Sequence, residues 1–121
     1  MKSVFALFFV LSIVSCASVE QRTRTELVGH WRYMDKKQSC DYSFKKDGSF
    51  TGEVRHHARL VSKFTGRWSV SHQVLLYTYL SDAFRRIPSG ATDRDQLLEV
   101  NEDSFLIQAA NGDRRRYRQV R

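Results

Sequence analysis

Residues 40–56 read CDYSFKKDGSFTGEVRH, and this stretch decides the fold. Apolar side chains alternate with polar ones from Cys40 to Phe44, and the alternation resumes from Phe50 to His56. A period of two is typical of a strand that buries one face. Asp47-Gly48, between the two runs, supplies the positive φ angles that a tight hairpin needs. The stretch therefore predicts two antiparallel strands joined by a short turn.

The same period of two extends on both sides of this hairpin, from Leu27 to the end of the chain. Asn111-Gly112 predicts a second tight hairpin, and the one long loop, residues 81–95, contains the only proline, Pro88. No βαβ unit and no long amphipathic helix is indicated. The other six strands are expected at residues 27–33, 60–70, 74–80, 96–101, 104–109 and 114–120.

Eight antiparallel strands in a meander leave two unpaired edges, one at each end of the sheet. Pairing the first strand with the last removes both edges, so we expect an all-β, eight-stranded, antiparallel up-and-down barrel. Gly52 and Gly66 lie within strands, at positions that suit the bends of a small barrel. The interior of such a barrel is filled by side chains or holds one small ligand.

The first sixteen residues predict export. Lys2 precedes an apolar run that is too short for a stable transmembrane span and is typical of a secretory signal peptide. The segment ends Ile13-Val14-Ser15-Cys16, which resembles the lipobox of bacterial lipoproteins. The resemblance implies cleavage before Cys16 and attachment of lipid, such as palmitate, to its thiol and new amino terminus. A soluble secreted protein with a free cysteine near its start is the alternative.

These features divide the chain into a signal peptide (1–15), a lipidated cysteine with a tether (16–22) and one barrel domain (23–121). Fully extended, residues 17–22 span roughly 20 Å, which would keep the barrel close to the membrane. Thr23 and Glu26 have the spacing of a capping box, so a single helical turn is expected before Leu27. Because Ala17 is not acidic, we expect the outer membrane, facing the periplasm.

Charge and cysteine content narrow the function classes. Removing residues 1–15 takes away only Lys2, which leaves 19 basic against 13 acidic residues, a formal charge of +6 instead of +7. The excess suits anionic lipid head groups or acidic partners, or is simply the solvated outer face of the strands; the exported address argues against nucleic acid. With Cys16 lipidated, Cys40 is expected to be a buried thiol, with an intermolecular disulfide or a reactive centre as alternatives.

Several short motifs resemble the lipocalin-like domains of small bacterial lipoproteins, over Leu27 to Val120. The resemblance implies an up-and-down barrel and, in some members, binding of a lipophilic molecule. It also implies that Gly29 and Trp31 belong to a barrel-closing motif in which Arg116 or Arg118 packs on the tryptophan ring. The motifs are residues 27–31, Phe44 with Asp47-Gly48-Ser49-Phe50, residues 66–70, and Asn111-Gly112-Asp113 followed by arginines and a tyrosine.

Binding is the expected role. His56 and His57 are adjacent in a strand and point to opposite faces, so no shared metal is expected, and nothing around Cys40 resembles a protease. We therefore expect no enzyme, metal or cofactor. The first hypothesis is a monomer that holds a small apolar ligand among Phe50, Phe64, Trp68 and Phe105, with loop 81–95 at its mouth. The second is a protein-interaction module with a filled barrel, such as an envelope assembly factor or an inhibitor of an exported enzyme.

Two sets of residues are expected on a membrane or partner surface. The first is basic: Arg85 and Arg86 in the long loop, and Arg114, which shares one face of the last strand with Arg116 and Arg118. The second depends on the orientation of residues 74–80, which are apolar on both faces. If Tyr77 and Tyr79 face outward, they form a docking patch.

Overall fold

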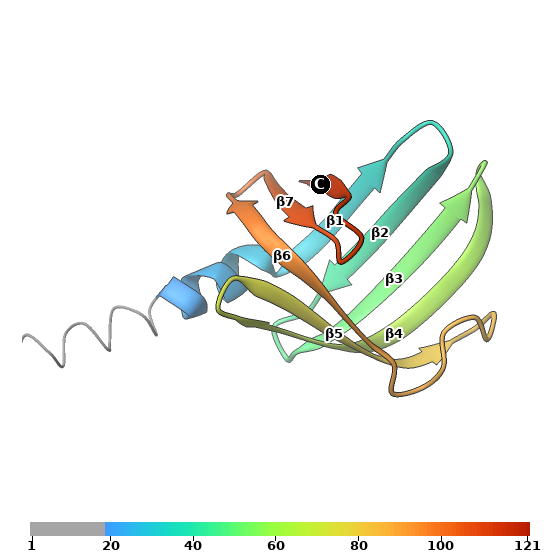
Figure 1. Ribbon diagram of the computed structural model, residues 1–121, viewed down its shortest axis with the longest axis horizontal. Helices are drawn as coiled ribbons and strands as arrows, with labels where there is room; N and C mark the ends of the chain where they lie inside the picture. Colours follow the sequence, from blue (N-terminus) through green and yellow to red (C-terminus); the bar gives the residue numbers. More distant parts are fainter. Residues whose placement is uncertain (1–18) are drawn as a thin grey trace, which may run out of the picture.

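The computed structural model of the chain describes residues 19–121 and confirms the all-β barrel (Figure 1). A short helix over residues 19–27 precedes eight antiparallel strands, which close into a barrel in sequence order. The predicted signal peptide, Cys16 and residues 17–18 lie outside the described residues. The strands are β1 (Gly29–Met34), β2 (Gln38–Phe44), β3 (Ser49–His56), β4 (Arg59–Ser71), β5 (Val74–Asp82), β6 (Thr92–Val100), β7 (Ser104–Gln108) and β8 (Arg114–Gln119).

The barrel has two different ends, because the strands alternate in direction. The open end carries the connections at residues 35–37, 57–58, 83–91 and 109–113. The closed end carries the helix, the connections at residues 45–48, 72–73 and 101–103, and the C-terminus. Figure 1 shows the helix on one side of the molecule and the tips of the β1–β2 and β3–β4 hairpins on the other.

The helix covers the closed end. Leu27 is fully buried, and its carbonyl oxygen accepts a hydrogen bond from the indole Nε1–H of Trp31 at 2.8 Å. The guanidinium carbon of Arg24 lies 4.6 Å from the ring centroid of Trp68, a cation–π contact. At the other end of the helix, the carboxylate of Glu20 accepts from the backbone N–H of His72 at 3.2 Å. The helix is therefore attached to the barrel along its length.

This helix corrects two expectations for the N-terminal segment. Residues 19–22, predicted as part of an extended tether, are helical. The hydroxyl of Thr23 donates to the carbonyl oxygen of Val19 at 3.0 Å, so Thr23 lies inside the helix and does not form a capping box at its start. Hydrogen bonds within the helix and contacts with the barrel hold these polar residues in place. The hydropathy of the residues reveals neither kind of interaction.

The barrel closes where β1 meets β8, and we call this junction the seam. Only two residue pairs are in register there, Trp31 with Gln119 and Arg32 with Arg118. Beyond the last strand, the backbone N–H of Val120 donates to the carbonyl oxygen of His30 at 2.8 Å and extends the pairing by one bond. The seam is thus the shortest of the eight strand pairings.

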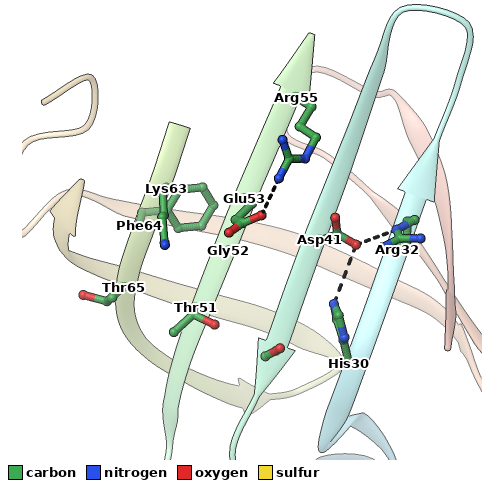
Figure 2. Close-up of a pocket in the computed structure, with 11 residues that line it drawn as sticks. His30, Arg32, Asp41, Thr51, Gly52, Glu53, Arg55, Lys63, Phe64 and Thr65 are labelled. Atoms are coloured by element: carbon green, nitrogen blue, oxygen red, sulfur yellow. Dashed lines mark hydrogen bonds and ion pairs between the residues drawn. The ribbon is translucent and has the colours of Figure 1, made fainter. Parts of the chain in front are cut away.

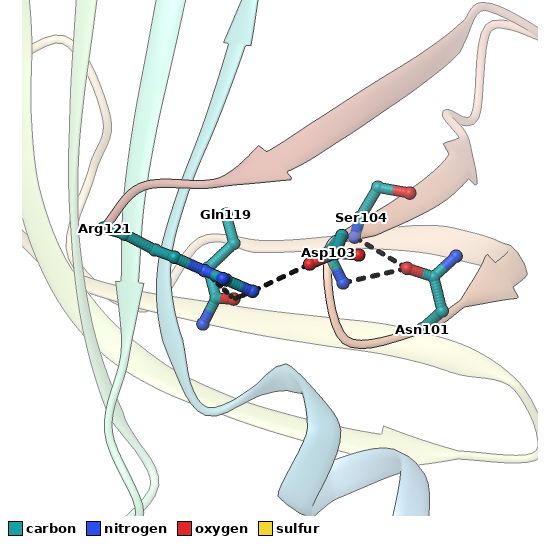
Figure 3. A network of polar contacts seen from close by, with 5 residues as sticks. All are labelled: Asn101, Asp103, Ser104, Gln119 and Arg121. Carbon is teal, nitrogen blue, oxygen red and sulfur yellow. Dashed lines mark hydrogen bonds and ion pairs between the residues drawn. The ribbon is translucent and has the colours of Figure 1, made fainter.

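Polar contacts brace the C-terminal side of the seam (Figure 3). The side-chain oxygen of Asn101 accepts from the backbone N–H groups of Asp103 and Ser104, both at 2.9 Å, and so caps the β6–β7 turn. Asp103 in that turn pairs with the guanidinium of Arg121 at 2.8 Å, and its carbonyl oxygen accepts from the N–H of Gln119 at 2.9 Å. These contacts tie the end of the chain to the neighbouring turn.

The predicted arginine of the barrel-closing motif is not the one that packs on a tryptophan. Trp31 packs edge to face against Phe105, with ring centroids 5.0 Å apart. Arg116 lies on the outer face of β8, where it pairs with Glu99 at 2.8 Å, and Arg118 is exposed on the same face. The alternation of β8 turns both arginines away from the interior, and the observed tryptophan–arginine contact is the one between Trp68 and Arg24.

The lower interior, next to the closed end, is packed with aromatic rings. Phe44 contacts the rings of Trp68, Phe50 and Phe105, with centroids 5.0 to 6.4 Å apart. Each of these large side chains is buried, which stabilises the fold by roughly 1.5–3 kcal/mol per side chain. Two glycines within strands, Gly52 and Gly66, make this packing possible. A Cβ on Gly52 would collide with the ring of Phe64, and one on Gly66 with the backbone carbonyl of Thr78.

The long loop is shorter than predicted. β5 runs to Asp82 and β6 starts at Thr92, so the loop covers residues 83–91 at the open end. The buried carboxylate of Asp82 accepts from the backbone N–H groups of Phe84, Arg86 and Ile87 at 3.0–3.1 Å. Although burial by itself raises the pKa of Asp82, these hydrogen bonds hold it below its ordinary value. One carboxylate therefore fixes the first half of the loop.

Candidate functional site

Above the phenylalanine rings, toward the open end, the barrel interior is lined by tyrosines. We call this region the upper chamber. Tyr33, Tyr42, Val54 and Arg115 point inward yet remain only partly buried. Their partial exposure shows that solvent reaches the inward face of the barrel at this level. The other chamber residues are Cys40, Tyr77, Tyr79, Asp95 and Tyr117, from β2, β5, β6 and β8.

The tyrosine rings are in mutual contact. The ring centroid of Tyr42 lies 5.5 Å from that of Tyr117 and 5.8 Å from that of Tyr77. Tyr33 lies 5.8 Å from Tyr117, and Tyr77 stacks on Tyr79 at 6.4 Å. Burial is the main cause that raises the pKa of Tyr42, Tyr77, Tyr79 and Tyr117. Their hydroxyls therefore stay protonated and offer both donors and acceptors to the chamber.

Asp95 is the carboxylate of this chamber. It is 9% exposed, and one of its oxygens accepts from the Tyr77 hydroxyl at 3.0 Å. Burial raises the pKa of Asp95 to about 6, and the neighbouring Asp93 adds to the rise; the bond from Tyr77 and the charge of Arg115 work against it. The chamber thus contains a carboxyl group that changes charge slightly below neutral pH.

Arg115 is the cation of the chamber. Its guanidinium carbon lies 5.5 Å from the ring centroid of Tyr33. Its neighbours on β8 point the other way: Arg114 is exposed and donates to the Gln108 side chain at 3.3 Å, and Arg116 pairs with Glu99. Of three consecutive arginines, alternation brings only Arg115 inside.

Cys40 has the position that alternation predicts. It is a buried free thiol on the inward face of β2. Burial raises the pKa of the thiol above its ordinary value. A buried thiol with a raised pKa is a poor nucleophile, which argues against Cys40 as a reactive centre.

The four residues predicted to line a ligand cavity are all buried. Phe50, Trp68 and Phe105 belong to the ring packing of the lower interior. Phe64 lies between Phe50 and Tyr79, with ring centroids at 6.0 and 5.2 Å, and so adjoins the chamber. The structure thus brings the tyrosines, and of the phenylalanines only Phe64, to the place where the barrel is open.

The surface residues predicted from the sequence lie in two different places. Tyr77 and Tyr79 are buried and face inward, while Leu80 is exposed, so the tyrosine pair does not form a docking patch. The sequence left the orientation of β5 open because both of its faces are apolar. Arg85, Arg86 and Arg114 are exposed at the open end, as expected for surface residues.

A groove of about 400 Å³ lies on the outer face of β1 to β4 (Figure 2). Four of its charged side chains form two ion pairs, Arg32 with Asp41 at 2.6 Å and Arg55 with Glu53 at 3.1 Å. Ser43, Thr51 and Thr65 add hydroxyls from the same face, each from a different strand. Because its ion pairs are satisfied internally and exposed to water, this groove has the character of an ordinary solvated sheet face.

Within residues 19–121, no group of three or more His, Cys, Asp or Glu side chains is arranged to hold a metal ion. The same part of the chain contains no helix that is long and apolar enough to span a membrane.

Comparison with known proteins agrees with this fold. No protein-family model and no curated protein sequence matches the chain. Among solved structures, it is similar to a lipocalin-like protein from Bacteroides uniformis, with a TM-score of 0.57 and 17% sequence identity, over 78% of this chain and 99% of that one. At this identity the likeness concerns the fold alone. The chain is therefore a closed eight-stranded β-barrel of the lipocalin-like type.

Proposed function

We propose that the protein is a membrane-anchored envelope lipoprotein whose barrel binds a small amphipathic ligand in the upper chamber. The supporting observation is the partial exposure of Tyr33, Tyr42, Val54 and Arg115, which all point into the barrel. A concave site lined by aromatic rings, with a few polar groups, is the usual form of a small-molecule site. The lipocalin-like fold favours binding over catalysis, although a fold alone does not assign a function.

The polar groups of the upper chamber favour an amphipathic ligand over the apolar ligand expected from the sequence. The Tyr77 hydroxyl already pairs with Asp95, and the Tyr33 hydroxyl with Asp35. A purely apolar ligand would, however, displace water from the partly exposed Tyr42 and Arg115 and leave their remaining hydrogen-bonding positions without partners. Burying unpaired polar groups is costly, at about 1–3 kcal/mol each. The ring faces of Tyr42 and Tyr117 suit an apolar or aromatic body, while the charged residues suit a polar end. The ligand is therefore amphipathic rather than wholly apolar.

The membrane anchor in this proposal rests on the lipobox-like Ile13-Val14-Ser15-Cys16. Lipid on Cys16 holds the barrel at the outer membrane, where it faces the periplasm and acts as a monomer. A single acyl chain gives only reversible attachment, so lipid on both the thiol and the amino terminus provides the stable anchor.

Titration with N-phenyl-1-naphthylamine, a neutral dye whose fluorescence rises in apolar surroundings, tests the binding site. We expect saturable binding by the wild-type barrel and its loss in Val54→Trp, because the indole fills the chamber. Thr51→Trp is the matched control. Thr51 lies three places before Val54, on the outward face of β3, so the same indole enters the groove on the outer face and should leave binding intact.

Three results would count against this proposal. No saturable binding by the folded wild-type protein excludes a chamber of this kind for such molecules. Unchanged binding by Val54→Trp excludes the chamber as the site. Loss of binding in Thr51→Trp but not in Val54→Trp moves the site to the outer groove. Circular dichroism of both variants confirms that the barrel is folded in each case.

The packed lower interior favours a second candidate, the protein-interaction module. Met34 and Phe84 are 67% and 47% exposed at the open end, and such side chains suit contact with a protein partner. A photo-crosslinking residue at position 84, introduced in cells, tests this role. One discrete crosslinked envelope protein, together with no dye binding, would favour the module over the ligand carrier.

A further inference from the structure

We infer that the ligand of the upper chamber carries an anionic group, such as a carboxylate, and that Arg115 binds it. The inference rests on the proposed function and names the ligand class for the same site. It starts from the contrast between the three consecutive arginines of β8, of which only Arg115 faces the interior.

Arg115 has no acidic partner of its own. Within residues 19–121, the ion pairs join Asp41, Glu53, Glu99 and Asp103 to other basic side chains, and none involves Arg115. The chamber carboxylate, Asp95, instead accepts from the Tyr77 hydroxyl. The charge of Arg115 acts to lower the pKa of Asp35 and of Asp95, but neither carboxylate forms an ion pair with it. A partly buried cation in this position is stabilised further by an oxyanion in direct contact.

The surroundings of Arg115 leave its hydrogen-bond donors usable. The guanidinium carbon lies over the ring of Tyr33, a cation–π contact that uses none of the N–H donors. The Tyr117 hydroxyl can accept from one of these donors, which leaves the others for a ligand. The edge of the guanidinium carries the N–H donors, whose fork geometry matches the two oxygens of a carboxylate or a similar oxyanion. The Tyr33 hydroxyl donates to Asp35 at 2.8 Å, which holds the ring in place beneath the guanidinium.

The open end has the charge that suits an anionic ligand. Exposed basic side chains occur on three sides of the entrance: Lys36 and Lys37 between β1 and β2, Arg59 at the start of β4, and Arg85 and Arg86 in the long loop. They outnumber the carboxylates near the same end, which are Asp35, Asp82, Asp93 and Asp113. A rim of this sign raises the local concentration of anions and their rate of entry.

Two dyes with one ring system test the inference. 1-Anilinonaphthalene-8-sulfonate is N-phenyl-1-naphthylamine with an added sulfonate, so the ratio of their dissociation constants isolates the anionic group. We expect the wild-type protein to bind the sulfonate dye at least about ten-fold more tightly than the neutral dye. A charge-assisted hydrogen bond provides a binding free energy of this size. Arg115→Met should abolish this preference, measured as the ratio of the two dissociation constants of the variant itself.

Arg114→Met is the matched control, because it removes the same charge from the adjacent, outward-facing position. We expect it to keep the preference. Equal affinity of the wild-type protein for both dyes overturns the inference but leaves the proposed function standing, whereas failure of both dyes to bind overturns the proposed function itself. If Arg115→Met and Arg114→Met lose the preference for the sulfonate dye equally, the preference comes from surface charge, and a role for Arg115 is overturned.

Arg115→Lys covers the case in which the methionine variant does not fold. Lysine keeps the charge but lacks the planar fork, so the preference should fall, and an unchanged preference contradicts paired hydrogen bonding by the guanidinium. Displacement of the neutral dye by octanoate, compared with octan-1-ol, extends the test to carboxylates. Octanoate should displace the dye more strongly from the wild-type protein, and equal displacement rules out a carboxylate ligand.

Discussion

Asp95 links the chamber to the stability of the fold. Its pKa is about 6 in the folded protein, against an ordinary value of 3.8, and burial is the main cause. The folded state therefore binds the proton more tightly than the unfolded state does. The resulting stabilisation is complete below pH 3.8 and is lost as the pH rises through about 6.

We therefore predict that Asp95→Asn gains stability relative to the wild-type protein as the pH rises from 4 to 7, because the variant has no carboxylate to ionise. The relative gain should be about 1–3 kcal/mol, after allowance for screening by solvent. Urea unfolding at several pH values measures it. Asp93→Asn, which removes an exposed carboxylate two residues earlier, should change much less. Parallel pH profiles for Asp95→Asn and the wild-type protein would contradict the prediction.

Gly66 lies at a position in β4 where the barrel has no space for even a methyl side chain. A Cβ there would meet the Thr78 carbonyl, which is backbone and cannot turn aside, as well as the Phe50 ring. We predict that Gly66→Ala lowers the free energy of unfolding by more than about 2 kcal/mol, or prevents folding. Gly112→Ala is the control: its backbone is strained at φ +92°, but nothing lies within 4 Å, so the loss should be nearer 1 kcal/mol.

At the scale of the elements, the seam between β1 and β8 is the weakest part of the barrel wall. Val120→Pro removes the N–H that donates to His30, and we predict a loss of about 1–3 kcal/mol in the free energy of unfolding. Val120→Ala keeps the N–H and should cost less, which separates the hydrogen bond from the side chain. Hydrogen exchange at Arg32 gives a second measurement, since its amide lies on the β8 side of β1 and should exchange faster in the proline variant. Equal stability of the two variants would show that the seam does not depend on this bond.

The elements also show what the sequence does and does not reveal. Alternation and hairpin turns predict most strands, because a barrel wall must bury every second side chain. They miss the start of β6, where Thr92 to Asp95 are all polar and where Asp95 is nevertheless buried against Tyr77. The helical turn predicted before Leu27 is confirmed, but the helix extends back to residue 19. The sequence does not reveal this extension, because its attachment depends on Arg24 and Glu20, whose partners are distant in the chain.

The candidate site was less predictable than the fold. Period two places Phe50, Trp68 and Arg115 on inward faces but does not say how high each lies in the barrel or which level is open. That depends on the stagger of the strands and on ring packing, such as the stacking of Tyr77 on Tyr79. The basic face of β8 favours Arg114 as a functional residue, whereas the side chain that enters the chamber is that of Arg115.

For the whole molecule, the proposed anchor makes a simple prediction. Cys16→Ala should move the protein from the membrane fraction to the soluble fraction and remove labelling by radioactive palmitate. Cys40→Ala is the matched control and should keep both properties, because Cys40 is buried in the barrel. Palmitate labelling that persists in Cys16→Ala would contradict the anchor.

The attachment of the helix to the closed end has a consequence for how the protein would exchange its ligand. The helix includes residue 19, three positions after Cys16, and it is fastened to the barrel by Arg24 and Glu20. In an anchored protein the closed end is thus nearest the bilayer, and the entrance opens toward water. Ligand then leaves by dissociation into the aqueous phase, so its rate of transfer to acceptor vesicles should not depend on how many vesicles are present.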